Sequence, residues 1–162
     1  MSYGYGPVDG PHTWSKKFEH AGGSHQSPIN IATSDVQRDP TLKALKCDFK
    51  GITENLLIVK EHNFQISIHG IASMTGGPLS SSYRLAQFHF HWGSDDHWGS
   101  EHLVDGRSFS AELHLVFFNE KYSSFQAAIE NKDGISVLGV FLQVIYANYL
   151  VKMFYFIRLS KP

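Results

Sequence analysis

The stretch QFHFHW, residues 87–92, decides the fold of this chain, because it places two histidines two positions apart among aromatic residues. It closes the longer run YRLAQFHFHW (83–92), whose alternation predicts a β-strand. Side chains alternate across a strand, so Gln87, His89 and His91 share one face and the aromatic residues take the other. A helix would need histidines three or four residues apart to bring them onto one face. The spacing therefore predicts a strand that presents two imidazoles on the same side.

A second predicted strand carries a third histidine. The run RSFSAELHLVFF (107–118) alternates in the same way, so Glu112 and His114 point to one side. If the two strands are neighbours with matched faces, three imidazoles converge. The candidate ligands are then His89, His91 and His114. Three neutral nitrogen ligands leave a tetrahedral Zn²⁺ with one open position, which is the arrangement of a catalytic rather than a structural site.

Polar residues beside these histidines support the metal interpretation. Gln87 and Glu112 stand two positions before His89 and His114 on the same faces. There they would act as acceptors that hold the rings in one tautomer and orientation. An isolated His-x-His pair is more often part of a surface or a packed core than of a metal site. Spacing and polar partners together leave metal binding and plain packing about equally supported.

The rest of the chain predicts a mostly β fold in a single domain, residues 1–162. Further strands are expected at LLIV (56–59), FQISI (64–68) and ISVLGVFLQV (135–144). The TGGP cluster (75–78) predicts a turn, and Asp105-Gly106 predicts a type I′ hairpin turn. One helix is expected at 123–134, capped by Ser123 with Gln126 three residues later. The first 40 residues are expected to be irregular.

Composition narrows the function classes. With 14 basic and 15 acidic residues, the net charge is −1, so nucleic acid is not expected as a partner. Cys47 is the only cysteine, which excludes an intrachain disulfide and suits a reducing compartment. The N-terminal residues lack a basic region followed by an apolar stretch, so no signal peptide is read there and a cytoplasmic location is expected.

The tail IYANYLVKMFYFIRLSKP (145–162) differs from the rest of the chain in being heavily apolar and aromatic. A membrane-spanning helix is disfavoured because polar residues interrupt the run. These residues are Gln143, Asn148, Lys152 and Arg158. A membrane-associated variant that uses the tail remains an alternative.

The stretch SEHLVDGRSFSAELHLV (100–116) resembles the signature of the α-class carbonic anhydrases, and QFHFHWGS (87–94) is similar to their first ligand strand. Other similar stretches are YGYG (3–6), GPHTW (10–14), QSPINI (26–31), GGPL (76–79), YRL (83–85) and VLGVFLQV (137–144). The resemblance implies a twisted mixed central β-sheet with short peripheral helices. It also implies a lyase that hydrates carbon dioxide reversibly to bicarbonate and a proton, by attack of zinc-bound hydroxide.

Matched by position, the resemblance implies roles for individual residues. His89, His91 and His114 would bind Zn²⁺, and His62 would be the proton shuttle, for which an ordinary pKa of roughly 6.5 is suited. Glu101 would orient a threonine at the reaction centre. Tyr5 and Gln65 would line the hydrophilic side of the cavity, and the carbon dioxide pocket would include Val116, Phe125 and Val137.

The resemblance is expected to stop after Val144, and the chain ends well before a family member would. The expectation is an incomplete domain with a divergent tail, without the threonine that Glu101 would orient. Zinc binding is then expected with weak or absent catalysis, and open sheet edges would favour self-association. A non-catalytic zinc-binding fragment or a carbonic anhydrase-related interaction protein is the alternative. Inactive relatives lose zinc histidines, so the three histidines retained here favour the enzyme.

Overall fold

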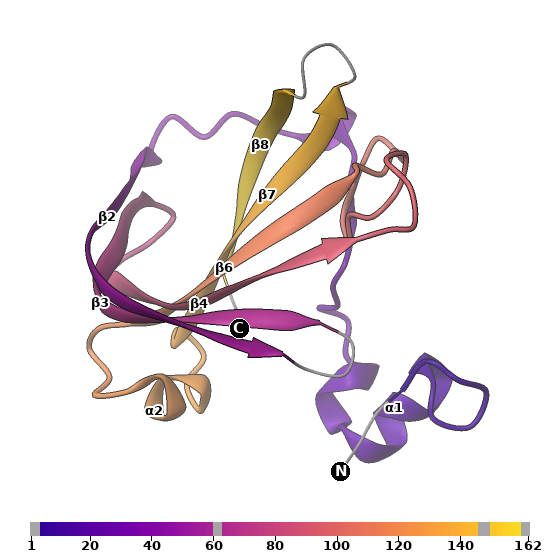
Figure 1. Ribbon diagram of the computed structural model, residues 1–162, viewed down its shortest axis with the longest axis horizontal. Helices are drawn as coiled ribbons and strands as arrows, with labels where there is room; N and C mark the ends of the chain where they lie inside the picture. The colour runs from indigo at the N-terminus through magenta and orange to yellow at the C-terminus, as the bar shows by residue number, and fades with distance from the viewer. Residues whose placement is uncertain (1–3, 60–62, 146–149, 160–162) are drawn as a thin grey trace.

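The computed structural model describes residues 4–59, 63–145 and 150–159, and most of them form one twisted antiparallel sheet (Figure 1). The strand order is β2-β3-β4-β6-β7-β8. The bounds are β2 (Lys43–Val59), β3 (Phe64–Gly77), β4 (Tyr83–Trp92), β6 (Ala111–Asn119), β7 (Ile135–Ile145) and β8 (Leu150–Leu159). Each strand pairs with its neighbour in this order through antiparallel ladders.

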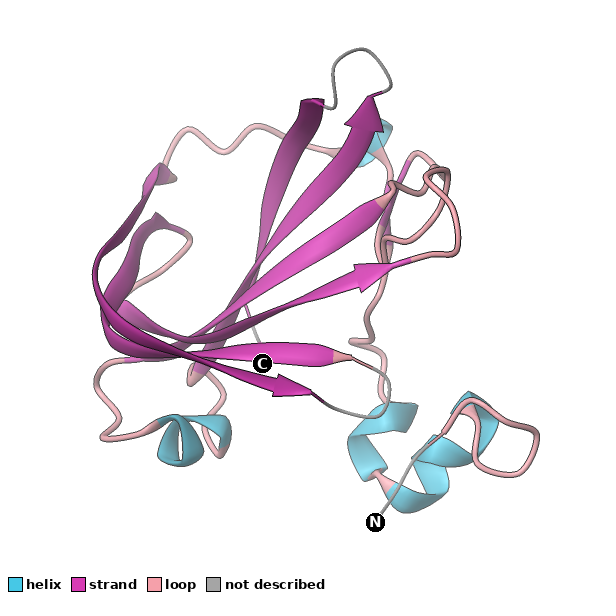
Figure 2. Cartoon of the chain, in the orientation of Figure 1, coloured by secondary structure: helices cyan, strands magenta, loops and turns pink. Residues whose placement is uncertain are grey.

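The remaining elements are short and lie at the periphery, as Figure 2 shows. Strands β1 (Asn30–Ile31) and β5 (Leu103–Val104) form a separate parallel pair. The helices are α1 (Pro11–Lys17), α2 (Phe125–Ile129) and two 3-10 turns, Glu19–Gly22 and Thr33–Asp35. The mostly β architecture with short peripheral helices is thus confirmed. The parallel component of the expected mixed sheet is confined to the β1–β5 pair among the described residues.

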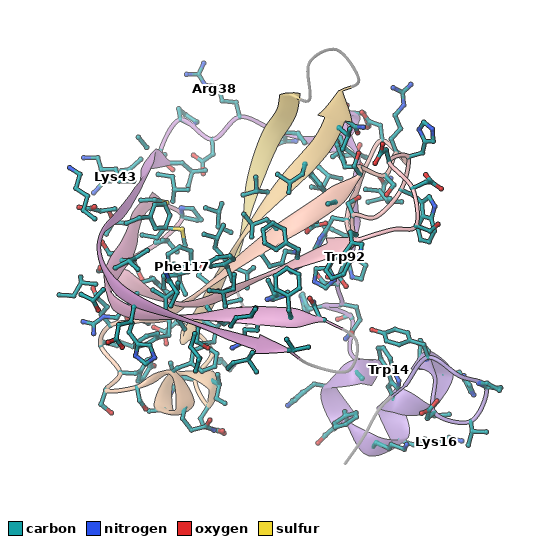
Figure 3. All side chains as sticks on the ribbon, in the orientation of Figure 1. Trp14, Lys16, Arg38, Lys43, Trp92 and Phe117 are labelled. Carbon is teal, nitrogen blue, oxygen red and sulfur yellow. The ribbon has the colours of Figure 1, made fainter. Side chains whose placement is uncertain are left out.

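The two faces of the central strands have different chemistry. One face of β4 and β6 bears the histidines, and the other bears apolar residues that the curled β2–β3 hairpin helps to enclose. In Figure 3, Phe117 lies among the side chains gathered inside this curl. A register shift between Leu85 and Gln87 marks an irregularity in β4. The core consists of Ile68, Ala72, Met74, Tyr83, Leu85, Phe117, Leu138 and Val140.

Strand β4 has the bounds that the sequence predicted, but the bounds of β2, β3 and β6 differ from the prediction. The strands β2 and β3 are far longer than LLIV and FQISI, and β3 runs into the TGGP turn, where Gly76 has φ 81°. Strand β6 begins at Ala111, not at residue 107, because Phe109 donates its N–H to Ser100 Oγ in the preceding loop. The Asp105-Gly106 turn is confirmed: both residues have positive φ (49° and 75°) between hydrogen-bonded Val104 and Arg107.

Both helical expectations need correction. Helix α2 is capped by Ser124, whose hydroxyl accepts from Ala127 N–H, and not by Ser123, and it ends at Ile129. The N-terminal segment is not wholly irregular, because Pro11 begins α1, at a position where its missing N–H costs nothing. Trp14 in α1 donates its indole N–H to backbone carbonyls of the preceding loop.

The apolar tail supplies a strand. Strand β8 pairs antiparallel with β7 from Leu150 opposite Ile145 to Leu159 opposite Ser136. Within the described residues, none of the helices is long and apolar enough to cross a membrane.

Candidate metal centre

Three histidines converge on one face of the β4–β6 ladder. In register, His89 lies opposite His114, and His91 lies opposite Glu112. One candidate ligand atom from each histidine lies within 4.8 Å of the other two. The ring centroids are 5.2 Å apart for His89 and His91, and 4.7 Å for His91 and His114. The predicted convergence of imidazoles across two neighbouring strands is therefore confirmed.

Gln87 fixes the orientation of the first histidine. Its side-chain oxygen lies 2.9 Å from His89 Nδ1. A carbonyl oxygen can only accept, so Nδ1 carries the proton and Nε2 keeps the lone pair that a metal needs. The i, i+2 spacing seen in the sequence is what places both side chains on one face.

We expect Gln87→Ala to weaken zinc binding by ~10–100-fold, because the His89 ring loses the acceptor that sets its tautomer. The measurement is competition for Zn²⁺ against a chromophoric chelator. Gln126→Ala, at an exposed position of α2, is the matched control and should bind zinc like the unmodified chain. Equal affinity of the two variants would contradict a role for Gln87.

Glu112 fixes the second strand's histidine from a fully buried position. Its Oε1 lies 2.5 Å from His114 Nε2 and 2.8 Å from His102 Nδ1, and its Oε2 accepts from the His102 backbone N–H. Burial raises the pKa of Glu112, but the hydrogen bonds from His102 and His114 outweigh it and hold the pKa far below its ordinary value. Glu112 is therefore a carboxylate, and His114 keeps Nδ1 for a ligand.

His102 is the functional residue that sequence reasoning missed. It is buried, bonds Glu112 twice, and its Nε2 lies 3.3 Å from Ser27 Oγ. Although His102, Glu112 and His114 also bring three candidate ligand atoms together, we assign them to a hydrogen-bond network. The carboxylate accepts a hydrogen bond from each ring, and these bonds occupy the atoms that would bind an ion. The only signal in the sequence was its place next to Glu101 in the quoted motif.

The donor set fits Zn²⁺. Imidazole nitrogen is a common zinc ligand, and the ligand form is the neutral ring. Burial lowers the pKa of His91, and this effect outweighs the opposing influence of the Glu101 carboxylate, so the ring is neutral at pH 7. The other two rings each turn one nitrogen to a fixed acceptor and leave the second for the ion.

Glu101 stands beside the histidines in the loop between β4 and β5. Its Oε2 lies 3.5 Å from His91 Nε2 and 3.9 Å from His114 Nδ1. The QSPINI segment (26–31) supports this loop: Leu103 N–H donates to Ile29 O, and Gly106 N–H donates to Asn30 Oδ1. The motif near the N-terminus thus acts as a scaffold for the loop that carries Glu101.

The other predicted site residues are placed unequally. Val116 pairs with Gln87 on one side and Val137 on the other, one row along from the histidines, and Gln65 pairs with His89. Phe125 lies in α2, where its ring contacts Phe118. Tyr5 is 71% exposed and packs edge-on against Trp14. His62 lies outside the described residues. The structure therefore groups Gln65, Gln87, His89, His91, Glu101, Glu112, His114, Val116 and Val137.

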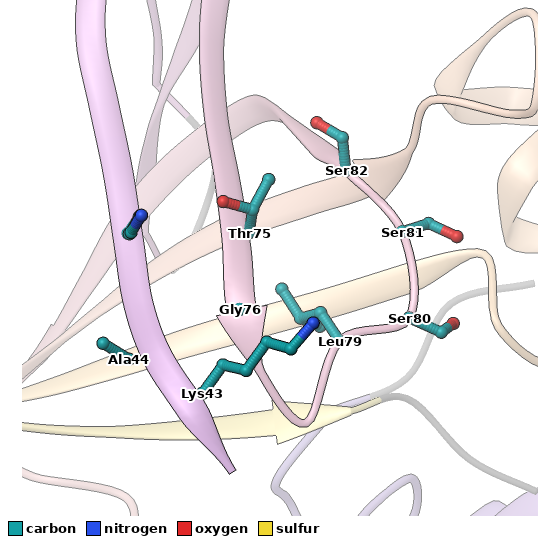
Figure 4. A pocket seen from close by; sticks show the side chains of 9 residues that line it. Lys43, Ala44, Thr75, Gly76, Leu79, Ser80, Ser81 and Ser82 are labelled. Atoms are coloured by element: carbon teal, nitrogen blue, oxygen red, sulfur yellow. The ribbon is translucent and has the colours of Figure 1, made fainter.

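A hollow of about 690 Å³ lies elsewhere, between the start of β2, the end of β3 and the loop that follows β3 (Figure 4). Lysines and hydroxyl side chains line much of it, and it shares no residue with the histidine centre. Its lining residues are Lys43, Ala44, Lys46, Thr75, Gly76, Leu79, Ser80, Ser81 and Ser82. It is therefore not part of the metal centre.

Comparison with known proteins agrees with this geometry. A sequence model of the family described as eukaryotic-type carbonic anhydrase matches residues 9–157. The chain belongs to this family. It is 45% identical over 150 residues to carbonic anhydrase 1 of Mus musculus, covering 90% of this chain. It is 42% identical over 152 residues to carbonic anhydrase 1 of Monodelphis domestica, covering 91% of this chain.

Two features of the match qualify the resemblance read from the motifs. The alignments cover 58% of each of these two carbonic anhydrases. The family match also runs past Val144 to residue 157, so it includes most of β8. The expectation that the likeness stops at Val144 is therefore corrected: the strand after that point fits the family pattern although its motifs are not recognisable by eye.

Proposed function

We propose that the histidine centre binds Zn²⁺ and that the chain catalyses the reversible hydration of carbon dioxide to bicarbonate and a proton. One observation carries this proposal: ring nitrogens of His89, His91 and His114 converge, while Gln87 and Glu112 hold the opposite nitrogens of two of the rings. Three neutral nitrogen donors leave a coordination position for a small molecule. Membership of the carbonic anhydrase family supports the same reaction.

When bound, zinc supplies a Lewis acid that makes hydroxide available from water near neutral pH. The remaining tasks fall to the chain. Gln87 and Glu112 keep the ligand rings oriented. Val116 and Val137, in the row next to the histidines, offer an apolar surface against which carbon dioxide can lie. Glu101 Oε2 would accept a hydrogen bond from a hydroxyl group at the centre.

The proton released by hydration must reach solvent, and we propose His62 for this transfer. Its ordinary pKa of roughly 6.5 allows it to accept and release a proton near pH 7. Tyr5 and Gln65 are proposed to contribute to the polar side of the cavity, and Phe125 to its apolar side. A cytoplasmic location is proposed because the chain has a single cysteine, Cys47, which suits a reducing compartment.

The test uses the 162-residue chain with measured metal content. We expect about one Zn²⁺ per folded chain, and stopped-flow hydration that is lost on chelation, restored by zinc and blocked by a sulfonamide. The rate is compared with that of a carbonic anhydrase 1 at equal zinc content. Zinc content near zero in folded protein would refute the metal site.

A second candidate is a zinc-binding protein without hydration activity. It is favoured by the surroundings of Glu101: its Oε2 lies 3.5 Å from His91 Nε2 and 3.9 Å from His114 Nδ1, and no hydroxyl group of the described residues donates a hydrogen bond to it. Losing a group that acts in the transition state typically slows a reaction by ~100-fold or more. Full zinc occupancy with hydration no faster than that of the chelated protein would select this candidate over the enzyme.

A further inference from the structure

The outer edge of β2 is regular between Glu54 and Val59, and nothing in its pairing pattern protects it there from the addition of another strand. Among the described strands β2 pairs with β3 alone, so it forms an edge of the large sheet. Register shifts interrupt its first part, between Lys43 and Lys46, Asp48 and Gly51, and Ile52 and Glu54. From Glu54 to Val59 the pairing with β3 is continuous. Bulges protect a sheet edge from further pairing, so the protected part of β2 ends at Glu54.

The side chains along the regular part are apolar and open on both faces. Leu56 is 55% exposed, Leu57 59%, Ile58 37% and Val59 78%. Successive side chains of a strand point to opposite faces, so neither face of this segment is covered. Short uncharged runs of this kind with high β propensity are the usual sites of strand addition.

We propose that a second copy of this chain adds to the sheet within the regular segment 54–59 of β2, in an antiparallel pairing of residues 55–59 related by a two-fold axis. The run is complementary to itself. A register centred on Leu57 pairs residues 55–59: Leu57 lies opposite its counterpart, Leu56 opposite Ile58 and Asn55 opposite Val59 of the second copy, each pair on one face. The chain's net charge of −1 offers little repulsion between copies. This pairing is independent of zinc and of catalysis.

The test measures association of the 162-residue chain by analytical ultracentrifugation over a range of concentrations, with chelator present. We expect a concentration-dependent dimer. Leu57→Lys should raise its dissociation constant at least ~10-fold, because two like charges would lie opposite each other and apolar burial would be lost. Val59→Lys should act in the same direction. Amide hydrogen exchange should slow across residues 54–59 as the concentration rises.

Ile71→Lys is the matched control. Ile71 is 63% exposed on β3, one strand inside the edge, so its substitution should leave the dimer unchanged. Near-ultraviolet circular dichroism checks that each variant keeps the fold. A monomer at every concentration would overturn the proposal. So would a dimer that ignores both Leu57→Lys and Val59→Lys, one disrupted equally by Ile71→Lys, or binding to phosphatidylcholine vesicles in place of self-association.

Discussion

The Glu112→Ala chain is expected to lose about 3–5 kcal/mol of unfolding free energy, because removing one member of a buried charged network leaves its partners unsatisfied. Glu112 is fully buried and accepts three hydrogen bonds, two from His102 and one from His114. None of these donors gains water when the carboxylate is removed, since both histidines are buried. The substitution therefore combines a cavity with three donors left without an acceptor.

Urea denaturation of the zinc-free chain measures this effect. Glu54→Ala is the control, because Glu54 is exposed on β2 and its loss should change the unfolding free energy by no more than about 0.5 kcal/mol. The unfolding free energy of Glu112→Gln should fall between the two. The amide keeps one acceptor oxygen, but it turns an NH₂ group toward the donors that the second carboxylate oxygen accepts from, either the two rings at Oε1 or the His102 backbone N–H at Oε2. Equal stability of the Glu112→Ala and Glu54→Ala chains would show that the network does not support the fold.

The second large effect is expected on metal affinity. His114→Ala should weaken zinc binding by at least ~100-fold, because about 10–16 kcal/mol of apparent zinc binding free energy is shared among roughly four ligands. His89→Ala and His91→Ala should behave alike, since one nitrogen from each ring meets the others within 4.8 Å. Competition with a chelator of known affinity measures all three.

Two further variants sharpen that test. His97→Ala removes an exposed histidine from the loop after β4, and its zinc affinity should stay within about twofold of the unmodified chain, since surface substitutions change free energies by about 0.5 kcal/mol or less. His102→Ala should weaken zinc affinity by ~10–100-fold, which is the range for residues that orient a metal ligand without binding the metal. If His102→Ala lost as much zinc affinity as His114→Ala, the metal site would have to be assigned to His102, Glu112 and His114 instead.

The β2 edge bears on how these measurements are made. If copies associate along residues 54–59, the apparent stability depends on protein concentration. The Glu54→Ala control lies at one end of that segment, so the denaturation series should be repeated with Leu57→Lys as background. A change in the ranking of the Glu112 variants on that background would show that association, and not the buried network, sets their stability.

Several parts of the centre could be predicted from local rules. Alternation along 83–92 and 107–118 placed His89, His91 and His114 on matching faces, and the i, i+2 spacing placed Gln87 and Glu112 beside them. These inferences succeed because the face of a side chain on a strand depends only on its parity. The Asp105-Gly106 turn was predictable for a similar reason, since the turn type requires residues that tolerate positive φ.

The alternation of side chains along a strand does not predict where loop residues lie. It also does not predict which residues distant in the chain contact each other. His102 reaches Glu112 from a loop, and the QSPINI segment supports that loop from more than 70 positions away. The capping serine of α2 and the first residue of β6 depended on competing local hydrogen bonds. The tail carried no recognisable motif, yet it pairs along β7.

The sequence by itself determined that the chain is mostly β and which imidazoles share a face, because alternation is a property of each strand alone. The tertiary structure decided that the two strands are adjacent with His89 opposite His114, that His102 completes the network around Glu112, and that residues 54–59 lie on an open edge. Register and burial are set by contacts between segments far apart in the chain. The order of residues within one segment carries no information about those contacts.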